Sequence, residues 1–428
     1  MMDLDNIQRF VSRAQLLSIV DSQSKKLALW SGSVSAGKTV ASLIAFLLAV
    51  RVAPRKGLII IVGKTLGTIY ANIFVLLQDR EIFGAKIASQ VIYTPGATSA
   101  VILGREVLLI GANNAESVGK IQGKTVVLAY VDEAVLLPQA FWNMLVSRLR
   151  VRGARLLATM NPASMNHWMR KEWILKAGEK NLIHFHFTMK DNPALPAGYE
   201  SDMEASFAGV FYDRMILGRW TNAAGAVYPM WDPKRHLIRF DDMPRIQRVL
   251  SVGTDWGVSN ASAGLMLGLT AEPKRRLVLM DEWRYDPRDH HGAQMAPSDQ
   301  VKAYLSWLGQ KHTPTDRTYA PEYQVYDPAA LAFAAELRNL NVDLTPAHNK
   351  VLPGIGTVSR LLSNDQLVVV TGKCAGFESE VTEYRWDPKA TAEGEDDVIK
   401  EDDHSLDAAR YGIHTVRQNF LYELADAA

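Results

Sequence analysis

Residues 32–39 read Gly-Ser-Val-Ser-Ala-Gly-Lys-Thr, which satisfies the pattern G-x-x-x-x-G-K-[ST] at every fixed position. One apolar run, 27–30, precedes this octapeptide, and a second, 40–50, follows it with Ser42 as its only polar residue. The pattern is typical of a phosphate-binding loop when a strand precedes it and a helix follows it. The flanks therefore favour such a loop over the alternative, a Gly/Ser turn between a strand and a helix.

The chemistry of a phosphate-binding loop assigns a role to each part of the octapeptide. The glycines let the backbone wrap closely around phosphates, and the N–H groups that open the next helix point at the anion. Lys38 is expected to reach the β- and γ-phosphates of ATP, and the Thr39 hydroxyl to hold Mg²⁺. The predicted ATP-binding residues are the whole loop: Gly32, Ser33, Val34, Ser35, Ala36, Gly37, Lys38 and Thr39.

Length and composition indicate an ordinary globular protein of more than one domain. At 428 residues, two or three domains are expected. Hydrophobic residues make up 48% and charged residues 22% of the chain, which excludes a disordered or fibrous class. The net charge of +1 neither indicates nor excludes a nucleic-acid partner, since binding needs a local basic surface.

Cysteine content and hydropathy bear on location. The single Cys374 excludes intramolecular disulfides and cysteine-based metal sites and favours a reducing compartment, although a small buried hydrophobe explains it better. The first twenty residues carry charges that are unlike a signal peptide, and the longest apolar stretch, 40–50, is too short to span a bilayer. We expect a cytosolic protein without membrane contact.

Short apolar runs recur through the first half of the chain. The runs at 58–62, 107–110, 125–131 and 156–158 suit strands buried on both faces. Helical stretches such as 66–78 lie between them. Alternating strands and helices predict a mostly parallel sheet covered on both sides, here an α/β P-loop NTPase domain.

Two acidic residues, Asp132 and Glu133, end the run at 125–131. Carboxylates at the end of a buried strand are costly unless a cation or water meets them. In a nucleotide hydrolase the first carboxylate supports Mg²⁺ and the second polarises the attacking water. The pair is a weak signal by itself and gains weight because it follows a phosphate-binding loop. We assign Asp132 to magnesium and Glu133 to the general base.

The next run leads into Thr159-Met160-Asn161-Pro162. Thr159 and Asn161 would lie near the γ-phosphate and couple its loss to the rest of the domain. A strand capped by an Asn-Pro turn is the alternative. The position after the Asp-Glu strand favours the coupling role.

Two further assignments stay open at this point. Arg148, Arg150 and Arg152 precede the Thr159 run. They form either a solvated basic face or the source of an arginine that reaches a γ-phosphate across a subunit interface. Upstream, Gln15 either reads the adenine edge or is a surface glutamine.

A change in composition marks the end of the first domain, because Pro, Gly and Trp punctuate residues 191–229. We expect an ATPase domain at 1–222, a connector at 223–250 and a second domain at 251–428. The second domain opens with a strand at 249–257 that carries Asp255, and strand candidates at 263–269 and 276–283 follow it. This arrangement resembles the RNase H fold, which gathers carboxylates from separate segments around two Mg²⁺ ions about 4 Å apart.

Further carboxylates arrive at suitable places. Asp327 follows a strand candidate, and Asp407 lies in a helix near the C-terminus with His404 on the same helical face. Glu282 is a possible fourth acid. A turn or helix cap explains each aspartate taken singly, but their order favours metal binding by Asp255, Asp327 and Asp407. For His404, a helix-start residue is the alternative.

The ordered set of motifs resembles the large terminase subunit of tailed bacteriophages. The resemblance covers about residues 10–415 and is carried by the phosphate-binding loop, the Asp-Glu strand, Thr-Met-Asn-Pro at 159–162, Gly-Thr-Asp-Trp-Gly at 253–257, Tyr-Asp-Pro at 326–328 and His-Ser-Leu-Asp-Ala-Ala-Arg-Tyr at 404–411. Each motif is moderately specific, and their order is highly specific.

This resemblance implies an ATPase that drives double-stranded DNA into a preformed capsid and an RNase H-like nuclease that cuts concatemeric DNA. It implies ATP with Mg²⁺ in the first domain, and Mg²⁺ or Mn²⁺ in the second. The implied partners are double-stranded DNA, the portal protein and a small terminase subunit, with a homo-pentamer assembled on the portal in the host cytoplasm. The residues that match the family's roles are Lys38, Thr39, Asp132 and Glu133 for ATP hydrolysis, Thr159 and Asn161 for coupling, and Asp255, Asp327 and Asp407 with His404 for the nuclease metals.

One departure from the family pattern concerns the loop. Many relatives carry an arginine inside it, whereas Val34, Ser35 and Ala36 stand there in this chain. A charge-stabilising arginine must then come from elsewhere. The alternative function is a helicase-like, DNA-remodelling ATPase whose second domain is a non-catalytic binding module.

Overall fold

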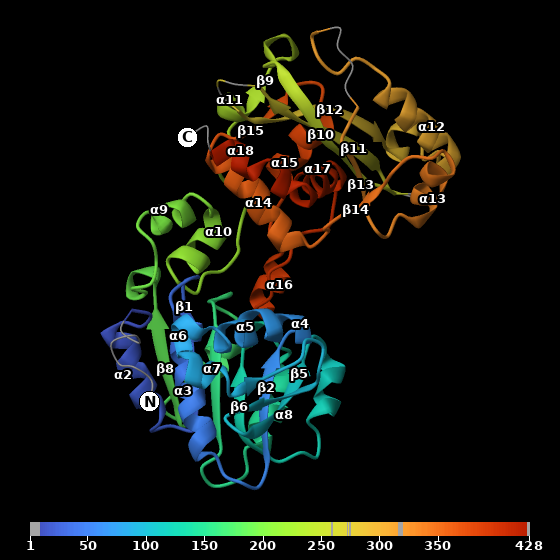
Figure 1. Cartoon of the computed structure of the whole chain (residues 1–428). Helices are drawn as coiled ribbons and strands as arrows, with labels where there is room; N and C mark the ends of the chain where they lie inside the picture. Colours follow the sequence, from blue (N-terminus) through green and yellow to red (C-terminus); the bar gives the residue numbers. More distant parts are fainter. Residues whose placement is uncertain (1–8, 258–259, 272, 274, 316–319, 426–428) are drawn as a thin grey trace. The chain divides into compact units, whose positions relative to one another are not determined.

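The computed structural model describes residues 9–257, 260–271, 273, 275–315 and 320–425. It divides into two compact units, and each contains one sheet (Figure 1). Among the described residues, the first unit comprises 9–204, 210–222 and 391–395, and the second comprises 205–209, 223–390 and 396–425. The segment predicted as a connector, 223–250, contains β9 (Leu237–Ile238) and the start of β10 (Ile246–Asp255). The predicted domain limits stay a prediction.

The first sheet has eight strands in the order β3-β4-β5-β2-β6-β7-β1-β8. All pairs from β5 to β8 are parallel, while β3 and β4 pair antiparallel at one edge. Because β7 lies between β1 and β6, the end of β7 separates the phosphate-binding loop from the Asp-Glu pair. The strands are β1 Leu27–Gly32, β2 Leu58–Gly63, β3 Val91–Ile92, β4 Ser99–Ile102, β5 Arg105–Gly111, β6 Val126–Val131, β7 Arg155–Met160 and β8 Leu182–Phe187.

Both faces of this sheet are buried, as the apolar runs predicted. Along β1, Ala28 and Trp30 pack into one hydrophobic cluster, whereas Leu27 and Leu29 pack into the other, because successive side chains of a strand point to opposite faces. Helices α2 (Arg13–Ser22) and α3 (Lys38–Val52) contribute to the first cluster. Helix α8 (Gln139–Arg148) contributes to the second.

The helix expected at 66–78 is interrupted. It consists of α4 (Leu66–Ile69), a π-helical turn η1 (Tyr70–Phe74) and α5 (Val75–Leu77). A π-bulge inserts one extra residue per turn and is frequent at functional sites. Here it includes Asn72, which reaches the Asp-Glu strand.

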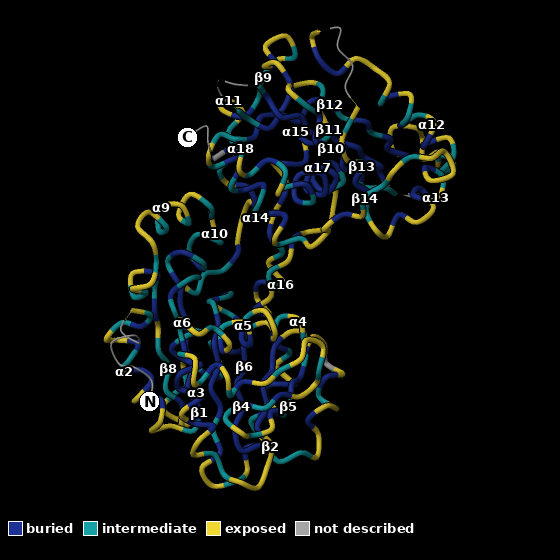
Figure 2. Tube along the Cα trace, in the orientation of Figure 1, coloured by how far each residue is buried: buried dark blue, intermediate teal, exposed yellow. Residues whose placement is uncertain are grey.

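The second sheet has the order β14-β13-β10-β11-β12-β15-β9. β10, β11 and β12 pair antiparallel, and β13 and β14 continue parallel from β10. This confirms the predicted RNase H-like α/β arrangement, in which β10, the strand that carries Asp255, is an interior strand between β11 and β13. β11 is buried along its whole length (Figure 2). The remaining strands are β11 Ser262–Thr270, β12 Leu277–Tyr285, β13 Tyr323–Tyr326, β14 Thr345–Pro346 and β15 Leu367–Val370.

Helix α17 (His404–Thr415) packs directly on β10 and β11 (Figure 1). Gly253 makes this close approach possible, because a Cβ there would overlap the Ala408 carbonyl oxygen and the Gly412 amide nitrogen. Ser251 Oγ also donates to Gly412 O over 3.1 Å. The contact brings the end of β10, with Asp255, beside the first turns of α17, with Asp407.

The other helical segments complete the two units. None of the described helices is long and apolar enough to cross a membrane. In chain order these segments are α6 Arg80–Phe83, α7 Ala85–Ala88, η2 Ala115–Lys120, η3 Ala134–Leu136, η4 Met169–Ile174, η5 Met189–Asp191, α9 Tyr199–Glu204, α10 Gly209–Phe211, η6 Tyr212–Ile216, α11 Pro233–His236, η7 Phe240–Asp242, η8 Pro287–His290, α12 Pro297–Leu308, α13 Leu331–Asn339, α14 Val351–Ser363, α15 Ala375–Glu383, α16 Pro388–Glu393, η9 Arg417–Asn419 and α18 Leu421–Ala425.

Candidate functional site

The phosphate-binding loop joins β1 to α3 and needs its glycines. Gly37 caps α3 with φ of 73°, in the left-handed region that glycine adopts without strain. Gly32 has φ of 139°, and a Cβ there would overlap the Phe187 carbonyl oxygen of β8. The loop therefore closes tightly against the neighbouring strand.

Hydrogen bonds hold the loop backbone from several sides. Ser33 N donates to Phe187 O over 3.0 Å, and Val34 N donates to Met215 O over 2.8 Å. Asn192 Nδ2 donates to Ser35 O over 2.7 Å. Segments far along the chain therefore set the shape of the loop.

Gln15 also supports the loop. Its Nε2 donates to Ala36 O over 2.7 Å, and its Oε1 accepts from Ser12 N over 2.8 Å. The side chain is fully buried. The surface alternative for Gln15 is therefore wrong, and its amide is engaged by the loop and not directed to a base.

Lys38 lies at the centre of the site. It is buried and donates to Gly32 O over 3.3 Å, to Ser33 O and to Asn161 Oδ1 over 3.0 Å. Burial lowers the pKa of Lys38 to about 8, although Asp132 and Glu133 act in the opposite direction. The predicted loop lysine and the predicted coupling asparagine are therefore in direct contact.

Asp132 receives its hydrogen bonds from two neutral side chains. Thr159 Oγ1, on the adjacent strand β7, donates to Oδ1 over 2.8 Å, and Asn72 Nδ2, on the π-helical turn, donates to Oδ2 over 2.8 Å. The carboxylate is buried. Burial of a carboxylate without a cationic partner is costly, and a bound metal ion would offset that cost. This donor set, with the half-buried Thr39 next to Lys38 on α3, fits Mg²⁺ bound to ATP phosphates.

Glu133 directly follows this carboxylate in a strained conformation. Its φ of 51° and ψ of 54° lie in the left-handed region, which non-glycine residues rarely adopt. Burial raises the pKa of Glu133, and Asp132 raises it further, while Lys64 and Lys38 lower it. Strained backbone and a raised carboxyl pKa are both common at catalytic positions, which fits a general base.

The three arginines before β7 lie at the amino ends of the strands, whereas the phosphate-binding loop lies at their carboxyl ends. β7 runs from Arg155, paired with Leu27 and Leu128 at the starts of β1 and β6, toward Met160 at the loop edge. Arg150 Nη2 donates to Lys124 O over 3.3 Å, just before β6. In a parallel sheet, side chains at the amino ends of strands cannot meet a ligand at the carboxyl ends. Arg148, Arg150 and Arg152 therefore do not complete the phosphate site of their own chain.

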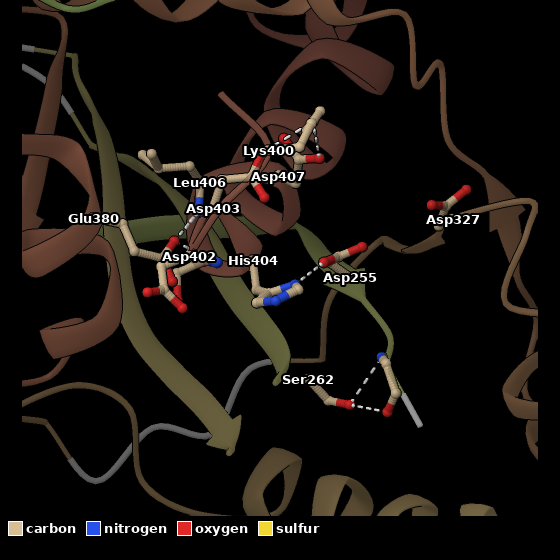
Figure 3. Close-up of polar contacts among 12 residues, drawn as sticks. Asp255, Ser262, Asp327, Glu380, Lys400, Asp402, Asp403, His404, Leu406 and Asp407 are labelled. Carbon is tan, nitrogen blue, oxygen red and sulfur yellow. Dashed lines mark hydrogen bonds and ion pairs between the residues drawn. The ribbon is translucent and has the colours of Figure 1, made fainter. Parts of the chain in front are cut away.

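In the second unit, Asp255 and His404 form a pair. His404 Nδ1, at the start of α17, lies 2.8 Å from Asp255 Oδ2 at the end of β10 (Figure 3). Burial raises the pKa of Asp255 and so do Asp407 and Asp327, while the bond to His404 lowers it. That bond to Asp255 raises the pKa of His404 in turn. Asp255 thus lies in a field of negative charge that a cation would relieve.

Asp407 lies three residues after His404, in the first turn of α17, among cationic side chains. Arg410 donates to its Oδ1 from Nη2 over 2.7 Å and from Nε over 3.2 Å. Lys400 Nζ donates to its Oδ2 over 3.0 Å. The Tyr411 hydroxyl links Asp407 Oδ2, at 3.4 Å, to Asp327 Oδ2, at 3.3 Å.

The predicted nuclease carboxylates are thus near one another without forming a coordination shell. Within the described ranges, no group of three or more His, Cys, Asp and Glu residues is placed to hold a metal ion. Figure 3 shows Asp327 set apart from the Asp255–His404 pair. The oxygen donors suit Mg²⁺ or Mn²⁺ chemically. The basic side chains that bind Asp407 were not foreseen from the sequence.

Both carboxylate oxygens of Glu282 accept hydrogen bonds from the protein, so its contacts do not indicate a fourth metal ligand. Ser405 Oγ donates to its Oε1, and Gly376 N donates to its Oε2 over 2.8 Å. The neighbouring Glu380 accepts from Ser405 N over 2.7 Å at the start of α17. Both glutamates therefore anchor the helix that carries His404 and Asp407.

Sequence reasoning missed Asn72 and Lys400. Asn72 lies inside an apolar helical stretch, and its role depends on a π-bulge that has no clear local signal. Lys400 lies in an acidic segment, 393–403, where one lysine gives no indication of its partners.

Comparison with known proteins identifies relatives of both units. Residues 29–232 match the family model "Terminase large subunit, T4likevirus-type, N-terminal". A solved large terminase from a thermophilic bacteriophage is 28% identical with a TM-score of 0.82, covering 95% of this chain and 99% of that chain. The complex of that terminase with ATP-γ-S is 28% identical (TM-score 0.80), and its complex with ADP is 27% identical (TM-score 0.81), each covering 95% and 99% of the two chains. No curated protein shows significant sequence similarity to the chain.

Proposed function

We propose that this chain, a member of the phage large terminase family, uses ATP hydrolysis to translocate double-stranded DNA into a procapsid and cuts concatemeric DNA with a metal-dependent nuclease. The observation that carries the proposal is the contact of Lys38 with Asn161, beside the bond of Thr159 to Asp132. These four side chains come from three separate segments and meet at the carboxyl ends of the strands. The related terminase of the thermophilic bacteriophage has been solved with ATP-γ-S and with ADP, which supports nucleotide binding by this chain.

In the ATPase, Lys38 would hold the β- and γ-phosphates, and Thr39 with Asp132 would hold the Mg²⁺ bound to them. Glu133 would orient the attacking water and accept its proton. Asn161 would leave Lys38 when a γ-phosphate takes its place and return after hydrolysis. Loss of the γ-phosphate would thereby change a bond at the end of β7.

In the nuclease, Asp255, Asp327 and Asp407, with His404, would hold Mg²⁺ or Mn²⁺. Such ions activate water and stabilise the leaving oxygen in phosphodiester cleavage. The Asp255–His404 pair would supply one face of the site and Asp407 the other. We further propose that the chain acts as a homo-pentamer on the portal protein. It would work there with a small terminase subunit, in the host cytoplasm.

Separate substitutions test the two activities. Glu133→Gln should abolish ATP hydrolysis and leave DNA cutting in Mn²⁺ intact, and Asp255→Asn should do the reverse. Each variant is otherwise close in shape to the original residue. If folded Asp255→Asn protein loses both activities equally, the two-site proposal is wrong.

The alternative is a DNA-remodelling ATPase with a non-catalytic second unit. The cations bound to Asp407 favour it, because they neutralise a carboxylate that a metal would need. Incubation of supercoiled plasmid with the protein in Mg²⁺ or Mn²⁺ separates the two. No nicking under any condition supports the alternative, and nicking that Asp255→Asn removes supports the nuclease.

A further inference from the structure

Lys400 occupies carboxylate oxygens at the proposed nuclease site. Its Nζ lies 3.0 Å from Asp407 Oδ2 and 3.0 Å from Asp403 Oδ2. Asp403 is the N-cap residue of α17, and Asp407 lies in the first turn. The ammonium group thus bridges two acids at the helix end that faces Asp255 (Figure 3).

The two cations on Asp407 differ in how easily they can leave. Arg410 is buried, binds Oδ1 with two nitrogens and donates to Asn349 O over 3.0 Å. Its other contacts hold it in place. The Lys400 side chain is 46% exposed and has a flexible stem. Oδ2 is therefore the oxygen that a metal ion can gain, and only after the ammonium leaves, because two cations at one oxygen repel each other.

Space for a displaced ammonium lies beside this pair. A cavity of about 270 Å³ is lined by Lys400, Asp403 and His404. Arg288 and Asp402 also line this cavity and pair over 2.6 Å, and Arg288 binds Asp286 over 2.8 Å. These pairs hold the backbone before α17, so the Lys400 side chain can rotate into the cavity while the segment stays in place.

We propose that Lys400 is a built-in counter-ion that opposes divalent metal binding at Asp407 until its side chain moves into the adjoining cavity. This inference rests on the nuclease proposed above. The ammonium group stabilises the Asp403 and Asp407 carboxylates when no metal is bound. A metal ion must displace it, and this displacement makes the free energy of metal binding less favourable. Removal of the ammonium therefore strengthens metal binding.

The experiment measures Mn²⁺ binding to the full-length, nucleotide-free chain by calorimetry and by the electron paramagnetic resonance of free Mn²⁺. Lys400→Met keeps the stem and removes the charge. Lys373→Met is the matched control, because the Lys373 side chain is 40% exposed and its Nζ lies 3.8 Å from Asp281 Oδ2, a buried aspartate of the same unit. Asp407→Asn identifies the binding that belongs to the nuclease site.

We expect Lys400→Met to tighten the Asp407-dependent Mn²⁺ binding by about tenfold, the scale of one charge-assisted hydrogen bond. Lys373→Met should leave it within about twofold, because Lys373 pairs with Asp281 and not with Asp407. Lys400→Gln should resemble Lys400→Met, and Lys400→Arg should keep the weak wild-type affinity. Thermal unfolding of each variant verifies that it is folded.

The results separate the failure of this inference from that of the nuclease. Unchanged or weaker Mn²⁺ binding in Lys400→Met and Lys400→Gln, with binding still lost in Asp407→Asn, overturns the role of Lys400 alone. Equal tightening in Lys373→Met also overturns it, because the effect would then be one of net charge. No Asp407-dependent binding in any protein overturns the nuclease metal site and this inference together.

Discussion

Lys38 Nζ lies 3.0 Å from Asn161 Oδ1, which joins the phosphate-binding loop to the end of β7 across 123 positions of sequence. The bond uses the ammonium group that ATP phosphates would need. A bound nucleotide and Asn161, at the end of β7, would therefore compete for the ammonium group of Lys38.

This competition predicts opposite effects of two substitutions at Asn161. Asn161→Asp should weaken ATP binding by about tenfold, because a carboxylate holds the ammonium more strongly than an amide. Asn161→Ala removes the competing acceptor, so it should tighten ATP binding by up to about tenfold and lower kcat. Titration with a fluorescent ATP analogue and steady-state hydrolysis distinguish them. Equal losses of affinity in both variants would contradict the competition.

Asn72 should matter for ATP hydrolysis although it lies outside every recognised motif. It donates to Asp132 Oδ2 over 2.8 Å and so orients the proposed magnesium carboxylate. Asn72→Ala should reduce kcat by about 10- to 100-fold, the usual range for a residue that orients a metal ligand. Gln78→Ala is the control, because Gln78 follows the same helical segment and donates to Val91 O at 3.3 Å. Hydrolysis that falls equally in both variants would point to disruption of the helix.

The strained backbone of Glu133 predicts a difference between two inactive variants. Glycine relieves the cost of φ at 51°, whereas alanine does not. Glu133→Gly should therefore unfold with a free energy about 1 kcal/mol higher than Glu133→Ala. Denaturant unfolding of both proteins provides the comparison. A Glu133→Gly protein that is less stable than Glu133→Ala would show that the turn is not strained.

Glu282 should affect stability and not metal binding. Glu282→Ala leaves Ser405 Oγ and Gly376 N without their buried acceptor. We expect a loss of about 2–4 kcal/mol in unfolding free energy. Mn²⁺ affinity, measured below the unfolding transition, should stay that of the wild type, whereas Asp255→Asn should lose it. A stable Glu282→Ala protein with weakened Mn²⁺ binding would instead make Glu282 a ligand.

His184 should make stability depend on pH. Burial and, to a smaller extent, the neighbouring His186 together lower the pKa of His184 from 6.5 to about 4. Between these values the unfolded chain binds more protons than the folded chain, so stability is complete above pH 6.5 and falls as the pH drops toward 4.

The loss from this one histidine is at most about 3 kcal/mol. His184→Gln can still bond with Ser31 Oγ, which lies 2.7 Å from His184 Nε2, and should flatten the pH profile of denaturant unfolding. His290→Gln, at an exposed position, is the control. A wild-type slope that persists in His184→Gln would assign the pH dependence to other groups.

Much of the fold could be predicted because its signals are local. The octapeptide, the buried apolar runs and the strand carrying Asp255 each depend on neighbouring residues, and the α/β class with an RNase H-like sheet was confirmed. The interruption of the helix at 66–78 could not be predicted, because a π-bulge is stabilised by contacts such as that of Asn72 with Asp132.

The sequence by itself determined which residues are the candidates for the chemistry: a lysine and threonine in a phosphate-binding loop, an acidic pair at a strand end, and aspartates spaced along a second domain. Only the tertiary structure decided what those groups contact. In the folded chain, Lys38 donates a hydrogen bond to Asn161, and the arginines before β7 lie away from the loop. Glu282 holds the start of α17, and Lys400 pairs with Asp407. Motifs follow from residue type and local spacing, whereas contacts follow from strand order and packing, which bring together side chains that are far apart in the chain.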